Sequence, residues 1–186
     1  MSGQTLQQQI LDFYKRPAAM TYAGGYAPRF DELPPRCGGS CRHCAGPAAA
    51  RTLGAPLYGL ALTDERRRES QIRAVAPMLD RLFGHDGRPL ATARPVEMRL
   101  VGICRHFTIL LVAMLRAQGA PARARCGFGS YFNSGRFEDH WVCEYWNAAE
   151  ARWVLVDAQI DELQRTVLNP DFRYARRAAP PLYRRR

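Results

Sequence analysis

Three residues in the second half of the chain have side chains of the types used in nucleophilic catalysis: Cys104, His140 and Asp157. A cysteine thiolate can attack an amide carbonyl and form a thioester, and an imidazole can move the protons that this reaction requires. A carboxylate beside the imidazole holds it in one tautomer and stabilises its charged form. Together, the three types are those of thiol acyl-transfer chemistry.

A helix is expected to position the cysteine. Cys104 follows Gly102 and comes just before a strongly apolar helix predicted over residues 107–118, which Gly119 and Pro121 end. The partial positive charge at the start of a helix, together with a nearby imidazolium, favours the thiolate form of a cysteine. We therefore expect Cys104 at or near the N-terminus of this helix.

A β-hairpin is expected to position the other two residues. Residues 140–146 and 152–157 are rich in Trp, Val, Tyr and Leu and are predicted to be strands, joined by a four-residue loop at 147–150. In that register His140 lies directly opposite Asp157, and opposite residues point to the same face about 5 Å apart at Cβ. The hairpin thus predicts a paired imidazole and carboxylate.

Other elements surround these in the sequence. Residues 4–15 are predicted to be an amphipathic helix, and residues 122–132 a strand followed by a turn. A further helix is expected to begin at the cap residue Thr63, to kink at Pro77 and to stop at Gly84. Helices and strands are therefore both present, without the regular βα alternation of a parallel sheet.

Four short motifs occur in a fixed order along the chain. They are G-x-C-R-x-F at 102–107, R-x-x-G-x-P-A-R at 116–123, H-W at 140–141 and W-x-x-V-D at 153–157. In these motifs the chain resembles the transglutaminase-like superfamily, over roughly residues 96–162, about a third of its length. One departure is His106, where that family usually carries Asp.

The resemblance implies an α+β, papain-like fold in which the helix that bears the nucleophile packs on an antiparallel sheet. It implies Cys104 as nucleophile, His140 as base and acid, and Asp157 as the residue that orients His140; Trp141 is expected to line the substrate cleft. The implied substrate is a peptide or protein amide, with no cofactor and no calcium. Hydrolysis is favoured over transfer to an amine, and a member that only binds peptides is the alternative.

The charge of +10 is unevenly distributed. Residues 36–55 hold three arginines and residues 172–186 hold six, in both cases without an acidic residue, so the rest of the chain carries +1. The basic tail at 171–186 is expected to be disordered, and it could bind nucleic acid through nonspecific charge contacts. With no recognition motif beside it, no specific nucleic-acid partner is predicted.

Three of the six cysteines lie in the first of these basic stretches. Cys37, Cys41 and Cys44 have the C-x3-C-x2-C spacing of the iron–sulfur motif in radical S-adenosylmethionine enzymes, and a metal or iron–sulfur protein is the alternative that this spacing leaves open. We favour a different hypothesis, that residues 36–55 and 171–186 are frame-shifted translations. A neighbouring reading frame can encode ordinary globular sequence there, and the coding DNA decides the question.

The remaining cysteines and histidines are expected to have structural roles. Cys126 and Cys143 lie in predicted strands and are expected in the core, because unpaired cysteines are among the most buried residue types. His85 and His106 are expected on the surface or at helix edges.

The length of 186 residues suits a single domain. We divide it into an N-terminal helical part at 1–95, a transglutaminase-like core at 96–170 and the tail at 171–186. No apolar run is long enough to cross a membrane, so no membrane partner is expected. From the first residues no secretory leader is expected, and a cytoplasmic location with unpaired cysteines is predicted. The oligomeric state is left open.

Overall fold

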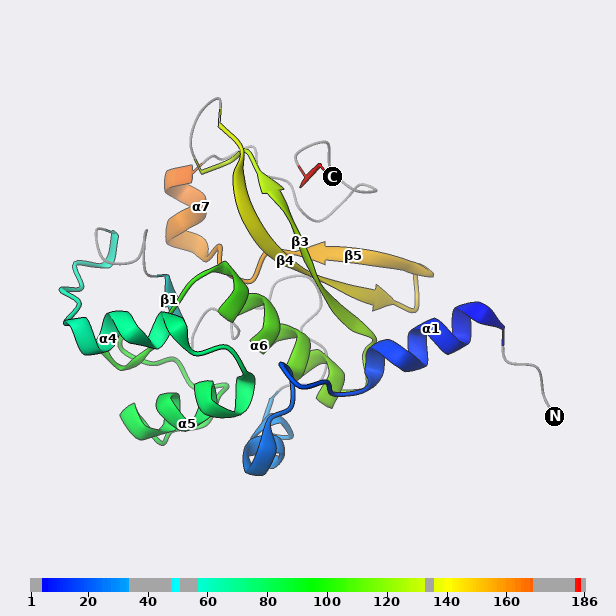
Figure 1. Ribbon diagram of the computed structural model, residues 1–186, viewed down its shortest axis with the longest axis horizontal. Helices are drawn as coiled ribbons and strands as arrows, with labels where there is room; N and C mark the ends of the chain where they lie inside the picture. Colours follow the sequence, from blue (N-terminus) through cyan, green and yellow to red (C-terminus); the bar gives the residue numbers. More distant parts are fainter. Residues whose placement is uncertain (1–4, 34–47, 51–56, 133–135, 169–182, 185–186) are drawn as a thin grey trace.

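The computed structural model describes residues 5–33, 48–50, 57–132, 136–168 and 183–184. Figure 1 shows a mixed α+β fold with one helix, α6 (Cys104–Ala117), between a twisted sheet and the helix α5 (Val75–His85). This arrangement confirms the prediction that the helix beginning at Cys104 packs on an antiparallel sheet.

The helix α6 forms the centre of the hydrophobic core. Every residue from His106 to Leu115 is buried, because one side of the helix meets the sheet and the other meets α5 and the 3-10 helix η1 (Gly24–Phe30). Gly119 follows the helix with φ of 78°, and the amide groups of Gly119 and Ala120 bond back to the carbonyl groups of Arg116 and Leu115. This is a Schellman motif, so the predicted end of the helix at Gly119 is confirmed.

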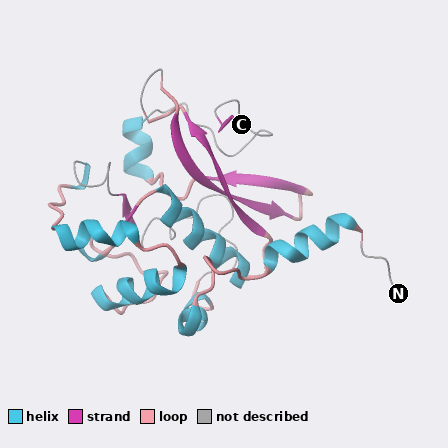
Figure 2. Ribbon diagram, in the orientation of Figure 1, coloured by secondary structure: helices cyan, strands magenta, loops and turns pink. Residues whose placement is uncertain are grey.

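The main sheet has four strands in the order β5-β4-β3-β6. Each neighbouring pair is antiparallel, and magenta arrows mark the strands in Figure 2. The bounds are β3 (Ala122–Gly129), β4 (Glu138–Asn147), β5 (Arg152–Val156) and β6 (Tyr183–Arg184). Of the basic tail at 171–186, only β6 lies within the described residues, and it pairs with the end of β3.

The β4–β5 hairpin differs in register from the prediction. Asn147 pairs with Arg152, so the loop is 148–151 rather than 147–150. The side-chain oxygen of Asn147 accepts the amide N–H groups of two loop residues, and Ala151 adopts the left-handed conformation with φ of 46°. Moving the loop one residue along shifts the partner of every residue by two, which leaves each side chain on the face where the prediction put it.

The predicted kinked helix from Thr63 to Gly84 is wrong, because two helices replace it. The first is α4 (Asp64–Arg68), continued by the 3-10 turn η2 (Glu69–Gln71), and the second is α5. The predicted cap is present, since the Thr63 hydroxyl accepts the amide N–H of Arg66. Pro77 lies in the first turn of α5, where its missing N–H costs no helical hydrogen bond, so the chain begins a new helix there instead of kinking an old one.

Smaller elements complete the described structure. The amphipathic N-terminal helix is present as α1 (Leu6–Lys15), with Thr5 as its cap residue. A two-stranded parallel pair joins β1 (Ala48–Ala50) to β2 (Leu100–Gly102), the strand that leads into α6. The other elements are the 3-10 turn η3 (Val96–Met98) and the helix α7 (Glu162–Leu168). Among the described residues, no helix has the length and apolar character to span a membrane.

Candidate active site

Cys104 is the first residue of α6, as expected. Ile103 before it is extended, with φ of −119° and ψ of 174°, so the chain turns directly from β2 into the helix. The thiol is half-buried. This position exposes Cys104 to the unpaired amide groups and the positive end of the dipole of a 14-residue helix.

His140 and Asp157 form a buried pair. His140 Nε2 lies 2.6 Å from Asp157 Oδ2, and each side chain is 2% exposed. The second carboxylate oxygen, Oδ1, accepts the amide N–H of Gln159 at 2.9 Å. In the observed register the two residues are diagonal neighbours on one face, and their side chains are long enough to bridge that spacing.

His140 also shares a hydrogen bond with the side chain of Cys104. Burial lowers the pKa of His140, but the negative charge and hydrogen bond of Asp157, with a smaller contribution from Cys104, outweigh it and raise the pKa from 6.5 to about 9. The structure thus brings the three predicted side chains together, with an imidazole held in its charged form at neutral pH.

His106 lies at the edge of a helix, in the first turn of α6, but it is buried, so the predicted alternative of a surface position is wrong. It is 1% exposed, and its Nδ1 atom accepts the amide N–H of Ile103 at 3.3 Å. Burial, helped by the charge of Arg105, lowers the pKa of His106 from 6.5 to about 4. The neutral ring thereby serves as the acceptor at the start of α6.

This burial predicts a pH dependence of stability. The unfolded chain binds a proton on His106 near pH 6.5 and the folded chain only near pH 4, so the free energy of unfolding should fall as the pH drops between these values, by about 3 kcal/mol. Urea unfolding at a series of pH values checks this. His106→Asn keeps a short acceptor but does not titrate, and it should flatten this part of the curve; an equally steep fall in the variant would contradict the account.

Gly102 leaves room for the same histidine. A Cβ atom at position 102 would meet His106 Cβ at 2.9 Å and Cγ at 3.2 Å. Both contacts involve the base of the side chain, which cannot move away without shifting α6. The glycine of the motif is therefore required by close packing of β2 against the first turn of the helix.

We expect Gly102→Ala to lower the free energy of unfolding by about 1–3 kcal/mol, because it forces β2 and α6 apart. Gly84→Ala is the matched control: a Cβ there meets nothing within 4 Å inside α5, so this change should be neutral or stabilising. Thermal unfolding of both variants measures the difference. Equal effects of the two substitutions would show that the Gly102 contact does not matter.

Two aromatic residues at the site were not predicted. The hydroxyl group of Tyr131 donates to Asp157 Oδ2 at 2.5 Å, and the ring of Phe132 lies edge-on to His140 with centroids 4.7 Å apart. Both follow β3 in the segment that the sequence predicted to be part of a strand. Aromatic residues are common in strands, so residue type alone did not mark them as site residues.

Trp141 and the two strand cysteines have different surroundings. Trp141 is half-buried and pairs with Cys126 across β3 and β4. Because successive side chains of a strand point to opposite faces, Trp141 and His140 leave β4 on opposite sides, and a place for Trp141 in the substrate cleft stays a prediction. Cys143 is buried as predicted, whereas Cys126 is exposed, so its assignment to the core was wrong.

Cys37, Cys41 and Cys44 lie outside the described residues, as does most of the stretch at 36–55. Within the described ranges, no group of three or more His, Cys, Asp and Glu side chains is arranged to hold a metal ion.

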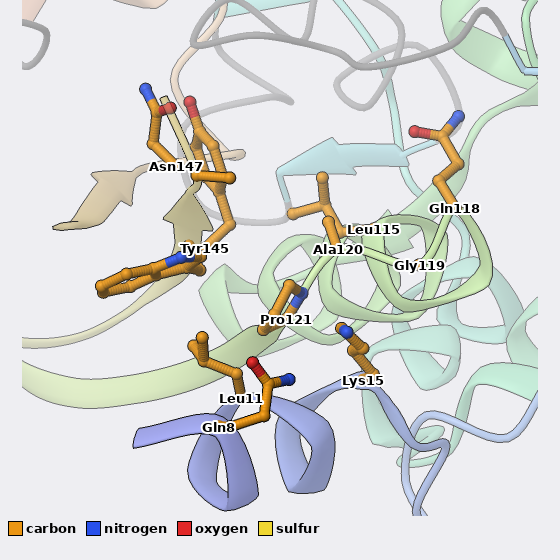
Figure 3. Close-up of a pocket in the computed structure, with 12 residues that line it drawn as sticks. Gln8, Leu11, Lys15, Leu115, Gln118, Gly119, Ala120, Pro121, Tyr145 and Asn147 are labelled. Carbon is orange, nitrogen blue, oxygen red and sulfur yellow. The ribbon is translucent and has the colours of Figure 1, made fainter. Parts of the chain in front are cut away.

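A cavity of about 540 Å³ lies away from Cys104, at the other end of α6 (Figure 3). Leu11 and Lys15 of α1, Gln118 after α6, and Tyr145 of β4 contribute to its wall. A 14-residue helix is about 20 Å long, which separates this cavity from the Cys104–His140–Asp157 site.

The sequence profile of the transglutaminase-like superfamily matches residues 61–158, more than half of the chain and the span that contains all three site residues. The chain belongs to the transglutaminase-like superfamily. The resemblance read from the four motifs is therefore confirmed, and the profile extends the match about 35 residues further toward the N-terminus, to include α4 and α5.

Among characterised relatives, a protein-glutamine gamma-glutamyltransferase of Pseudomonas aeruginosa is 32% identical over 130 residues. The match covers 58% of this chain and 19% of that protein, so this superfamily member spans less than a fifth of its relative's length.

Two solved structures align with parts of this chain. A candidate cysteine protease from Cytophaga hutchinsonii aligns over 80% of this chain and 42% of its own, with 15% identity and a TM-score of 0.45. The periplasmic domain of TgpA from Pseudomonas aeruginosa aligns over 75% of this chain and 50% of its own, with 20% identity and a TM-score of 0.28.

Proposed function

We propose that this chain is a cysteine enzyme that acts on amide bonds through a thioester on Cys104. The observation that carries the proposal is the hydrogen-bonded series Cys104–His140–Asp157 at the first turn of α6. A charged imidazole beside a thiol is the arrangement that activates a cysteine nucleophile.

The reaction then follows from the geometry. The Cys104 thiolate attacks the amide carbonyl carbon, and a C–S bond forms as the carbonyl π electrons move to oxygen. His140 donates its proton to the amide nitrogen, the C–N bond breaks, and the amine leaves. Water or a second amine, deprotonated by the now neutral His140, attacks the thioester and releases the thiolate. Asp157 holds the imidazole in place and stabilises its positive charge throughout.

For the substrate, we propose the side-chain carboxamide of glutamine in a peptide or protein. The name of the Pseudomonas aeruginosa relative, which is 32% identical over 130 residues, supports this choice of acyl donor. With glutamine as donor the leaving group is ammonia, whichever acceptor follows. Hydrolysis and transfer to a primary amine share the same thioester intermediate, so experiment must decide which acceptor the enzyme uses.

Ammonia release from a glutamine-containing peptide, with and without an added primary amine, tests the proposal. The wild type should release ammonia, and Cys104→Ala should release none above background, because the nucleophile is gone. Cys126→Ala, which removes an exposed thiol outside the site, is the matched control and should match the wild type.

Two outcomes would overturn the proposed function. Equal ammonia release from wild type and Cys104→Ala would exclude Cys104 as the nucleophile. Peptide binding without any release would instead indicate a non-catalytic, peptide-binding member of the superfamily. Iodoacetamide labelling separates these cases further, since the enzyme should react at Cys104 faster than at Cys126 near neutral pH.

The cytoplasmic location stays a prediction.

A further inference from the structure

Asp157 Oδ2 receives two hydrogen bonds, one from His140 and one from Tyr131. The Tyr131 hydroxyl lies 2.5 Å from Oδ2, and His140 Nε2 lies 2.6 Å from the same oxygen. The phenol ring is also edge-on to the imidazole, with the two centroids 5.7 Å apart. Tyr131 therefore contacts both members of the buried pair.

The backbone of β3 is shaped to accept this ring. A Cβ atom at Gly129 would meet Tyr131 Cε1 at 3.1 Å and Cζ at 3.3 Å, so the ring occupies the space that a larger residue at 129 would fill. Phe132 packs against the same ring: its centroid lies 4.5 Å from that of Tyr131 and 4.7 Å from that of His140, and its Cε2 atom would lie 3.4 Å from a Cβ at Gly129. Close packing against Gly129 and Phe132 restricts the ring and so the direction of the hydroxyl group.

We propose that Tyr131 is a positioning residue of the Cys104–His140–Asp157 site, whose hydroxyl group fixes the Asp157 carboxylate against His140 and takes up part of the negative charge on Oδ2. The inference deepens the proposed function and rests on it. Hydrogen bonds from a hydroxyl to an ionised carboxylate are short and strong, as the 2.5 Å distance indicates.

The sign of the effect on His140 follows from this arrangement. Among the described residues, the titratable side chains seen in contact with the imidazole are Cys104 from α6, Asp157 after β5 and Tyr131 after β3. A donor on Oδ2 reduces the negative charge that this oxygen presents to Nε2, so it weakens the hold on the imidazolium proton. Removing the hydroxyl group should therefore raise the pKa of His140 and leave the carboxylate less firmly oriented.

The experiment compares Tyr131→Phe with the wild type. The variant should raise the midpoint of the His140 NMR titration by about half a pH unit. It should also lower kcat for ammonia release roughly tenfold with little change in KM, since the lost bond acts on the reacting groups. With four histidines in the chain, a His140→Gln variant assigns the signal.

Tyr26→Phe is the matched control, because the Tyr26 hydroxyl donates to Asp80 at 2.8 Å, far along the chain from the site. It should leave both the midpoint and kcat unchanged. If Tyr131→Phe behaves like this control in both readouts, Tyr131 only packs and the proposal is overturned.

Placing 3-fluorotyrosine at position 131 keeps the shape of the ring and makes the hydroxyl a stronger donor. It should move the His140 midpoint in the opposite direction, downward, and this decides the question if Tyr131→Phe does not fold. An unchanged midpoint in the fluorinated protein would also overturn the proposal. If the wild type releases no ammonia, the proposed function is overturned but the role of Tyr131 is not. The NMR titration of His140 still tests the Tyr131 contact, because it does not depend on activity.

Discussion

Replacing Asp157 by asparagine is expected to lower kcat/KM for ammonia release by about a hundredfold or more. The neutral amide cannot stabilise the imidazolium, and it can hold the ring in the wrong tautomer. Burial then acts on His140 without the opposing charge, so the pKa of His140 should fall well below about 9. Steady-state kinetics and the NMR titration of His140 measure the two consequences separately.

Asp139→Asn is the matched control for that experiment. Asp139 is the residue just before His140 in β4, and its side chain is exposed, so the same chemical change there should leave kcat/KM within about twofold. A folded Asp157→Asn protein with nearly wild-type kcat/KM would show that the carboxylate takes no part in the chemistry.

Glu69 carries the largest expected effect on stability. The residue is 3% exposed, yet its Oε1 lies 2.7 Å from His85 Nε2, 3.1 Å from Arg81 Nε and 3.2 Å from Arg66 Nε. Its Oε2 accepts the amide N–H of Val101 at 2.8 Å. One carboxylate thus connects η2, α4 and α5 to β2, the strand that leads to Cys104.

We expect Glu69→Ala to lower the free energy of unfolding by about 3–5 kcal/mol, because it leaves the buried amide of Val101 without its acceptor and removes the buried carboxylate that binds Arg66, Arg81 and His85. Glu65→Ala is the comparison. Glu65 binds the same Arg81 at 2.6 Å, but its side chain is 73% exposed, and exposed pairs contribute at most about 1 kcal/mol. Denaturant unfolding measures both, and similar losses for the two variants would contradict a special role for the buried carboxylate.

The sequence predicted best the two ends of α6 and the reactive side chains of the site. Cys104 at the start of a long apolar helix, its end at Gly119, and a paired His140 and Asp157 all follow from local patterns that the structure shows. The predicted register of the hairpin was wrong, but it placed His140 and Asp157 on the same face, as the structure does. A slip of two in the pairing keeps side chains on their faces, so the error changed the spacing from opposite to diagonal and left the pair intact.

The sequence did not reveal the hairpin register or the burial of Glu69, for two different reasons. The loop of the hairpin is set by the Asn147 side chain and by Ala151 in a left-handed conformation, and no glycine marked that position. Glu69 lies among arginines in a polar stretch typical of a surface, and only the packing of β2 and α5 around it makes it buried.

Burial of single strand residues was equally hard to predict. Along one face of β3, Ala122 is buried, Ala124 is half-buried and Cys126 is exposed. The hydrophobic core on this face therefore does not extend as far as Cys126. Alternation assigns Cys126 to the core face, but it does not say how far along the strand the core extends. His106 shows the reverse case, a polar residue drawn into the core because its ring serves as an acceptor for Ile103.

The most direct test of the proposed chemistry is the intact mass of the protein after brief reaction with a glutamine-containing peptide and an acid quench. We expect a covalent adduct whose mass equals the peptide minus ammonia, located by digestion on the fragment with Cys104, and absent from Cys104→Ala. Ammonia release with no adduct on Cys104 under any quench time, or an adduct that persists in Cys104→Ala, would contradict a thioester on this residue.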